Sequence, residues 1–316
     1  MIRLSKIFII VALLLTNYCL AQQFPLSNQY VINQYSLSPS FAGLTKSPEL
    51  FANFRKDWEG IDGAPKTSYV SFFVPVNERV WLGGSIVNDQ TDIISNISAN
   101  FSYTYHLKAW EEHNFSFSLY GSIYHSVVDL TGVIVKDPND PVILDKQKLV
   151  GTSLNAGTSI LYNYKKLYTG IVIPTLISKH TISDKNDNNR FLVRERSLIF
   201  HISSILDLDN SWCFEPYFVL RSTKNSPSVF DISFLIRNEK KYWFGALLRK
   251  GGILGINIGA TLAESLVLNY SYEFSAKGML SKSSGTHEFS IGYYIYFQPK
   301  ERKAKKWRLR YPYIID

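Results

Sequence analysis

The stretch that decides the fold is HEFSIGYYIYF, residues 287–297. Every second position carries an apolar or aromatic side chain: Phe289, Ile291, Tyr293, Ile295 and Phe297. The positions between them begin with Glu288, Ser290 and Gly292, and the two tyrosines that follow carry a hydroxyl. Two-residue alternation is the period of a β-strand, so we expect one dry face and one wet face. Such a strand fits either a soluble sandwich or the last strand of a barrel in lipid.

Strands of this kind recur along the chain, with no convincing amphipathic helix between them. Alternation and turn residues predict strands at 49–57, 66–75, 79–89, 94–107, 113–125, 152–163, 166–177, 196–207, 211–223, 228–238, 241–250, 252–260, 265–274 and 286–297. Every second link between strands is short. All the long links lie between these short ones, at 58–65, 126–151, 178–195 and 275–285. About fourteen strands with this alternation predict an all-β transmembrane antiparallel barrel of the outer membrane, with short periplasmic turns and longer extracellular loops.

The N-terminus has the features of a secretory signal. Arg3 and Lys6 precede an apolar run at 7–15, and Cys19-Leu20-Ala21 suits a signal peptidase. The run is too short to span a bilayer, which needs about 20 apolar residues. We expect a signal peptide at 1–21, a periplasmic segment at 22–48, the barrel at 49–297 and a basic tail at 298–316, with both termini periplasmic. Only Cys213 would then remain, which excludes an internal disulfide.

The charge of the chain is concentrated at its C-terminal end. The formal net charge is +8, but residues 22–299 carry 25 basic and 24 acidic residues. A nucleic-acid-binding protein would need a basic face on the folded body, so that class is excluded. The tail is either simply solvated or a periplasmic contact for a partner or for anionic lipid. The residues of that contact would be Lys303, Lys305, Lys306, Trp307, Arg308 and Arg310.

The terminal strand also resembles the signal by which outer-membrane barrels are recognised for assembly. That signal has a polar residue, a glycine two positions later and two apolar residues spaced by one, the last usually aromatic. The matching residues are Ser290, Gly292, Ile295 and Phe297.

We find no motif for catalysis, for a metal or for a cofactor. The six histidines lack the spacing of a zinc site, and no phosphate loop or nucleophile elbow is present. We therefore expect a protein that is not an enzyme and holds no cofactor. One alternative stays open, a hydrolase that assembles a Ser/His pair at His125 and Ser126 or at His201 and Ser203.

The hairpin of the strands at 211–223 and 228–238 predicts its own register. Its apolar positions share one face, which turns four charges toward the lumen: Glu215, Arg221, Asp231 and Arg237. Directly opposed residues in an antiparallel pair have a constant sum of numbers. Arg221 with Asp231 and Glu215 with Arg237 both give 452, so we predict that these charges stand directly opposite each other.

Several motifs, in order along nearly the whole chain, resemble the PorP/SprF family of outer-membrane proteins of the type IX secretion system of Bacteroidetes. They are Gln34-Tyr35, Ser38-Pro39-Ser40-Phe41-Ala42-Gly43, Phe54-Arg55-Lys56-Asp57-Trp58 with Gly63-Ala64-Pro65, Asp137-Pro138-Asn139-Asp140-Pro141, Gly170-Ile171-Val172-Ile173-Pro174, Tyr242-Trp243-Phe244-Gly245 with Arg249, and Ser283-Ser284-Gly285-Thr286-His287-Glu288-Phe289.

The resemblance implies a non-enzymatic accessory barrel. Such a barrel assists export or surface attachment of a cognate secreted protein, such as a large adhesin, and its partners are outer-membrane lipid, that secreted protein and components of the type IX machinery. The alternative function is a general diffusion channel, because a fourteen-stranded barrel is wide enough to leave lumenal space.

Overall fold

A computed structural model of the chain describes residues 26–131, 148–182, 194–209, 211–238 and 241–295. The signal peptide predicted at 1–21, Phe297 and the six basic-tail residues lie outside the described residues. The strands are β1 (Glu49–Lys56), β2 (Lys66–Pro75), β3 (Val80–Thr91), β4 (Ile94–Trp110), β5 (His113–Asp129), β6 (Lys148–Tyr164), β7 (Leu167–Ile182), β8 (Ser197–Ser204), β9 (Leu206–Asp207), β10 (Trp212–Thr223), β11 (Val229–Asn238), β12 (Tyr242–Arg249), β13 (Ile253–Leu262), β14 (Leu266–Ser275) and β15 (Thr286–Tyr294).

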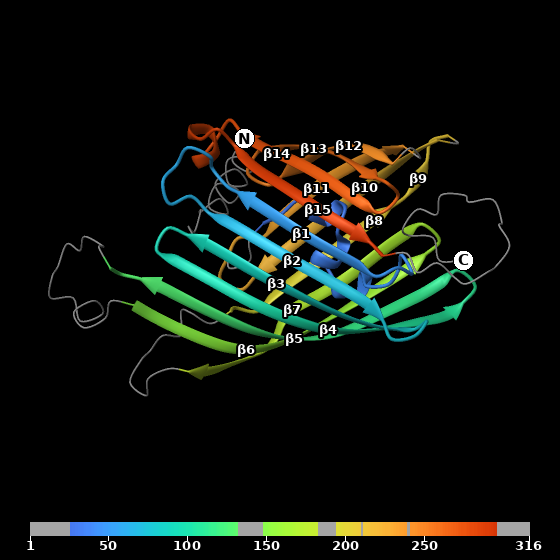
Figure 1. Cartoon of the computed structure of the whole chain (residues 1–316), viewed down its shortest axis with the longest axis horizontal. Helices are drawn as coiled ribbons and strands as arrows, with labels where there is room; N and C mark the ends of the chain where they lie inside the picture. The colour runs from blue at the N-terminus through green and yellow to red at the C-terminus, as the bar shows by residue number, and fades with distance from the viewer. Residues whose placement is uncertain (1–25, 132–147, 183–193, 210, 239–240, 296–316) are drawn as a thin grey trace, which may run out of the picture.

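The strands form a closed antiparallel barrel. Each pairs with its neighbour in the chain, and β1 pairs with β15 to close the ring. Because β8 and β9 both pair with β10, they are two parts of one interrupted strand, and the ring has fourteen strands. The predicted fourteen-stranded barrel is confirmed. The structure differs from the prediction mainly in β4 to β7, which run longer; β5 and β6 project beyond the rim (Figure 1).

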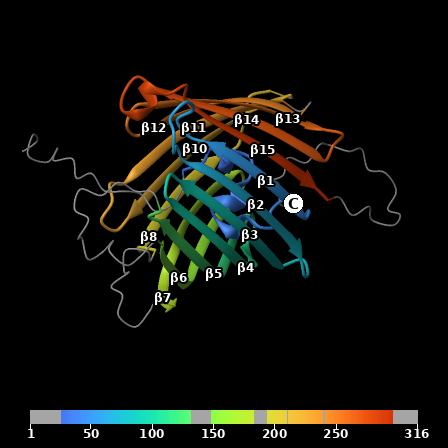
Figure 2. The same ribbon diagram turned by 60° about the vertical axis from the view of Figure 1, so that its left-hand side comes forward.

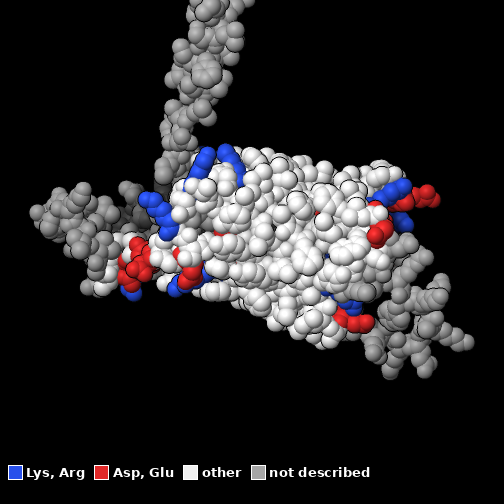
Figure 3. All heavy atoms as spheres, turned by 90° about the horizontal axis from the view of Figure 1, so that it is seen from above, with Lys and Arg blue, Asp and Glu red and all other residues white. Residues whose placement is uncertain are grey.

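The outer surface of the barrel is apolar between two charged ends. Lysine, arginine, aspartate and glutamate gather at the two ends in Figure 3, and a belt without charges separates them. On β4 the exposed positions include Ile97, Phe101 and Tyr103, whereas Ser98 and Ser102 are buried on the lumenal side. This distribution matches a lipid-facing band around a polar interior. No helix among the described residues is long and apolar enough to cross a membrane.

The terminal strand has the two faces that its alternation predicts. Phe289, Ile291 and Tyr293 point outward and are 48%, 41% and 49% exposed, whereas Glu288 and Ser290 point inward and are 1% exposed. The dry face of β15 is therefore the lipid side, which decides between barrel and sandwich.

The segment before β1 lies inside the ring of strands. It forms three short 3-10 helices, η1 (Gln29–Val31), η2 (Gln34–Ser36) and η3 (Pro39–Phe41), and most of its side chains are buried. Figures 1 and 2 show it between the walls of the barrel. We expected residues 22–48 to be a periplasmic segment; the described part, 26–48, is instead a plug. Its apolar side chains lack a strand period, because they face the barrel wall in several directions.

Candidate functional site: the plugged lumen

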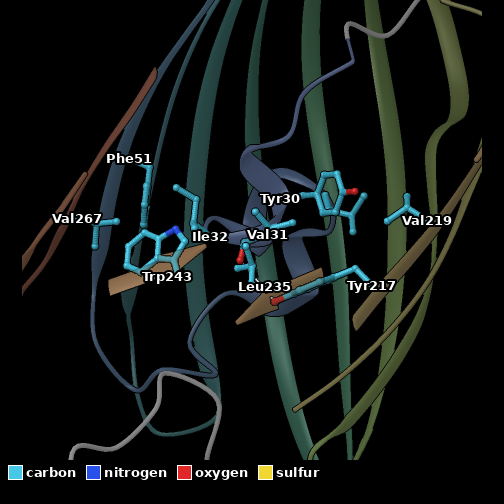
Figure 4. Close-up of a cluster of buried hydrophobic side chains, with 10 residues drawn as sticks. Tyr30, Val31, Ile32, Phe51, Tyr217, Val219, Leu235, Trp243 and Val267 are labelled. Atoms are coloured by element: carbon cyan, nitrogen blue, oxygen red, sulfur yellow. Dashed lines mark hydrogen bonds between the residues drawn. The ribbon is translucent and has the colours of Figure 1, made fainter. Parts of the chain in front are cut away.

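Apolar side chains of the plug pack against opposite sides of the barrel wall. In Figure 4, Tyr30, Val31 and Ile32 lie among Phe51 of β1, Tyr217 and Val219 of β10, Leu235 of β11 and Trp243 of β12. Phe41 and Leu44 form a second cluster with Leu161 of β6 and Tyr168 of β7. Tyr35 and Ala42 form a third with Phe73 of β2 and Trp81 of β3. The plug therefore contacts the wall around the ring.

Polar groups of the plug bond to hydroxyl groups and to an imidazole of the wall. The Tyr30 hydroxyl lies 2.9 Å from Ser233 Oγ on β11, and the Tyr35 hydroxyl lies 2.8 Å from Ser102 Oγ on β4. His106 Nε2 on β4 lies 2.8 Å from the Ala42 carbonyl oxygen. These bonds satisfy plug groups that would otherwise be buried without partners.

One carboxylate, Glu288 of β15, accepts several hydrogen bonds from the start of the plug. Its oxygens accept hydrogen bonds from the Asn28 amide at 2.9 Å, from the Gln29 amide at 3.2 Å and from the Ser27 hydroxyl. Asn53 Nδ2 on β1 donates to the same carboxylate at 2.9 Å. Hydrogen bonds to a charged acceptor are about twice as strong as neutral ones, so Glu288 is the main polar anchor of the plug.

Glu288 is one end of a buried network of ion pairs. Arg55 of β1 bonds to Glu288 and to Glu273 of β14, both at 2.9 Å, and to Asp57 at 2.8 Å. Arg249 of β12 bonds to the same Glu273 at 2.9 Å and to Asp231 of β11 at 2.7 Å. Each charge of this network is compensated by an opposite charge, which the low dielectric of a closed lumen requires.

The structure brings the four predicted lumenal charges together in two pairs, but not in the predicted register. Arg221 Nη1 lies 2.7 Å from Asp231 Oδ2, and Arg237 Nε lies 2.8 Å from Glu215 Oε1. The residues directly opposite Asp231 and Arg237 are Val219 and Cys213. The paired numbers sum to 450, so the predicted sum of 452 was wrong by two residues.

The reason for the error is the reach of arginine. Diagonal neighbours across a ladder stay within reach of a long side chain, so charge pairing fixes which face is inward but not the register. Asp231 stands directly opposite Arg249 of β12 and takes Arg221 as a diagonal second partner.

The plug runs through the barrel from one end to the other. Asn28 and Gln29 bond to Glu288 near the beginning of β15, at the end of the barrel where the long links lie. At the opposite end, the Ile295 amide donates to the Pro48 carbonyl at 2.9 Å. Among the described residues, the plug therefore begins near the loop end and β15 finishes at the turn end.

The assembly-signal residues lie on the seam that closes the barrel. Ser290 stands opposite Asn53 of β1 and accepts a hydrogen bond from its Nδ2 at 2.7 Å. Gly292 stands opposite Phe51, and a Cβ on this glycine would lie 2.2 Å from Phe51 Cε1. Ile295 faces outward. A glycine is needed on β15 because Phe51 fills the space toward the lumen.

The residues considered for hydrolysis do not form a catalytic arrangement. His125 Nδ1 lies 2.8 Å from Thr152 Oγ1, and Ser126 bonds to Asn96. His201 is buried against the ring of Phe41 in the plug. Among the described residues, no group of three or more potential ligands could hold a metal ion.

Sequence reasoning missed the plug and much of the ion network, namely Arg55, Arg249, Glu273 and Glu288. A signal was present: each is a charge on the lumenal face of an alternating strand, and three of the four lie within the motifs quoted above. Their convergence was not readable, because Arg55 and Glu288 meet only where the first and last strands pair.

Comparison with known proteins identifies both a family and a fold. The family model described as "Type IX secretion system membrane protein PorP/SprF" matches residues 19–293. No curated protein matches the chain. The CymD monoaromatic hydrocarbon channel is 14% identical, with a TM-score of 0.52, over 87% of this chain and 94% of that one.

Two further solved structures are less similar. A Pseudomonas aeruginosa FadL homologue is 9% identical, with a TM-score of 0.48, over 85% of this chain and 94% of its own. Acinetobacter baumannii Omp33 is 5% identical, with a TM-score of 0.43, over 79% of this chain and 98% of its own. At these identities, the likeness to the CymD channel concerns the fold alone.

Proposed function

The chain belongs to the type IX secretion system membrane protein PorP/SprF family, and from that premise we propose that it is a non-enzymatic accessory barrel that assists export or surface attachment of a cognate secreted protein. A large adhesin is the kind of cargo we expect. The other partners would be outer-membrane lipid and periplasmic or outer-membrane components of the type IX machinery.

The observation that carries this proposal is the plug. A diffusion channel needs a continuous aqueous path, yet plug residues bond to or pack against β2, β3, β4, β7, β8, β10, β11, β12 and β15. Glu288 and Arg249, both members of the buried ion network, form hydrogen bonds with the start of the plug. A filled lumen supports a role in binding protein at the barrel ends over a role in passing small solutes.

The experiment compares conductance with cargo binding. Purified protein in planar bilayers is expected to give no steady open conductance, and the protein isolated from cells is expected to copurify with one secreted protein. A steady open channel without such a partner would favour the general diffusion channel.

The proposed orientation has its own test. We place the loops at 126–151 and 178–195 outside the cell, and the start of the plug then lies at the outer end too. Epitope tags in either loop, or directly before residue 26, are expected to label on intact cells, whereas a tag after Asp316 is not. Labelling of the Asp316 tag alone would show that the topology is the reverse of the one proposed.

A further inference from the structure

Three cations lie on one sector of the barrel rim at the loop end. Arg196 comes just before β8, Lys224 just after β10 and Lys250 just after β12, and all three are exposed. None of the three forms an ion pair with a described residue. The two turns that carry the lysines contain no acidic residue, and Glu195 is the acidic residue nearest to the cations in sequence. This sector of the rim therefore has a net positive charge.

Two of these cations stand directly opposite each other. The ladder of β8 and β10 ends at the pair of Ser197 and Thr223. One residue further on, the Lys224 amide donates to the Arg196 carbonyl at 2.9 Å. Like charges in directly opposed positions of two strands repel each other. A pair of this kind without a carboxylate partner is the arrangement that an anion from outside the chain would stabilise.

The third cation belongs to the adjacent turn. The ammonium group of Lys250 donates to the Ser228 carbonyl at 2.7 Å, in the turn that also carries Lys224. Ser228 Oγ in turn donates to Ser222 Oγ on β10 at 3.2 Å. The Ser222 hydroxyl still has its own proton to donate. The three cations thus surround hydrogen-bond donors that suit the oxygens of an anion.

Exposed apolar side chains lie next to these charges on the same side of the sheet. Leu198 on β8, Phe230 on β11 and Leu248 on β12 are exposed at 46%, 36% and 45%. Leu198 and Leu248 are two residues from Arg196 and Lys250, so strand alternation places each leucine below its cation. Two residues of strand span about 7 Å. The cations therefore stand just beyond the apolar band, at the level of lipid headgroups.

The chain itself neutralises cations at the opposite end of the barrel. Three lysines of the turns there have a carboxylate partner, in the pairs Lys165–Glu112, Lys166–Asp207 and Lys241–Glu264. In Figure 3, basic and acidic side chains lie together at the right-hand end, whereas at the left-hand end, the loop end, some basic side chains stand away from any acidic one. The counter-charge that the chain supplies at the turn end is thus left out at the loop end.

We propose that this sector of the rim binds one anionic lipid through its phosphate group. Arg196, Lys224 and Lys250 bind the phosphate, with the Ser222 hydroxyl as a further donor, and the acyl chains lie along the apolar side chains below. The planar guanidinium of arginine matches the geometry of a phosphate, and basic residues at a membrane surface attract anionic headgroups. Only the choice of leaflet, the outer one, rests on the orientation proposed above.

The combination of charge and apolar surface selects a lipid over two other anions. Free phosphate satisfies the cations but gains nothing from Leu198 and Leu248. An acidic peptide also satisfies the cations, but its charged side chains would lie beside an apolar band, where their desolvation is unfavourable. A lipid carries its phosphate and its acyl chains in the order in which the rim presents cations and leucines.

The test measures lipid binding to the purified full-length protein in a non-ionic detergent. The probe is dioleoylphosphatidylglycerol, whose phosphate gives it a net negative charge. The control lipid is dioleoylphosphatidylcholine, which has the same acyl chains and a phosphate but no net charge. Native mass spectrometry counts the bound lipids during a titration and gives an affinity for each. We expect the anionic lipid to bind at least about fivefold more tightly, the gain from one cation near an anionic headgroup.

Variants locate the site on the rim. Lys224→Gln should weaken binding of the anionic lipid about fivefold, and Lys224→Gln with Lys250→Gln about 25-fold. The matched control is Lys165→Gln at the turn end, which removes the same charge and should leave the affinity unchanged. Lys224→Glu separates binding from folding. It places opposite charges at the Arg196 pair, so the barrel should keep its heat-modifiable gel mobility while it loses the lipid.

Three results would overturn the proposal. One is equal affinity for the anionic and the zwitterionic lipid. Another is equal affinity of Lys224→Gln and Lys165→Gln for the anionic lipid. The third is displacement of the bound lipid by inorganic phosphate or by a synthetic oligoglutamate peptide at the concentration of the lipid, which would assign the site to another anion. Reversed labelling of the epitope tags, or the absence of a copurified secreted protein, would contradict the proposals above but leave these affinities unchanged.

Discussion

The two halves of the lumen hold the plug by different means. The half made of β10 to β15 and β1 carries an ion network of Arg55, Arg249, Glu273, Glu288 and Asp231. Glu288 and Arg249 of this network form hydrogen bonds with Asn28 of the plug. The half made of β4 to β6 is lined by uncharged side chains, mostly Ser98, Ser102, Thr104, Ser116, Ser118, Ser122, Ser126, Ser153, Asn155 and Ser159. The first half fixes the plug by charge; the second lies against it through small hydroxyl groups.

The largest expected effect breaks the charged half. Arg55→Ala leaves Glu273 and Glu288 without their shared arginine, although Glu273 keeps Arg249. Removing one partner of a buried ion pair costs about 3–5 kcal/mol, so the variant should assemble poorly or release the start of the plug. Membrane yield, heat-modifiable gel mobility and protease access at residues 26–30 measure it. A fully assembled, protease-resistant variant would show that the network does not hold the plug.

A smaller loss is expected at the closing seam. Gly292→Val places a side chain against Phe51, where a Cβ alone would lie 2.2 Å from Cε1. Overpacking costs about 1–3 kcal/mol, and here it falls on the β1–β15 pairing that closes the barrel. We expect a lower yield of folded barrel from Gly292→Val than from Trp307→Val in the tail. Equal yields of the two variants, measured by heat-modifiable mobility, would show that the seam is no more sensitive to substitution than the tail.

The hairpin pair should matter less than Arg55. Arg221 is 15% exposed at its side chain, and its partner Asp231 keeps Arg249 when Arg221 is removed. Arg221→Ala should therefore cost about 1.5–3 kcal/mol, the range for one hydrogen bond to a charged group. Comparison of its unfolding midpoint in urea with that of Arg55→Ala checks the order. If Arg221→Ala lowers the unfolding midpoint more than Arg55→Ala does, Arg55 is not the main stabilising residue of the network.

The smallest effect is expected in the hydroxyl-lined half. Ser122→Ala removes one buried hydroxyl from β5 and no charge. The loss should stay below about 1 kcal/mol, with the plug still protected from protease. Plug release in this variant would mean that both halves hold the plug alike, and the contrast between them would fail.

The sequence predicts the structure where neighbouring residues face different surroundings, and fails to predict it where they do not. The strands were predictable because lipid and lumen alternate along each one, so Phe289 and Glu288 differ in kind. The predicted register of β10 and β11 was wrong by two residues, because Arg221 reaches Asp231 from a diagonal position as well as it would from the directly opposite one. The plug was not predictable, because Tyr30 and Phe41 pack on opposite walls and leave no period. The Arg55–Glu288 ion pair forms only because β1 and β15 pair to close the barrel, and no local sequence pattern indicates that pairing.

The anchoring of Ser27 by Glu288 has a consequence for the order of folding. These residues are 261 positions apart, so the contact that fixes the start of the plug cannot form until nearly all of the barrel strands exist. Contacts of such large sequence separation form slowly, because the loop they close must first be ordered. The first residues of the plug are thus synthesised before every barrel strand, yet are among the last to reach their place. A barrel halted before β15 joins β1 would expose an unanchored N-terminal segment, which gives proteases a direct way to distinguish unfinished molecules from finished ones.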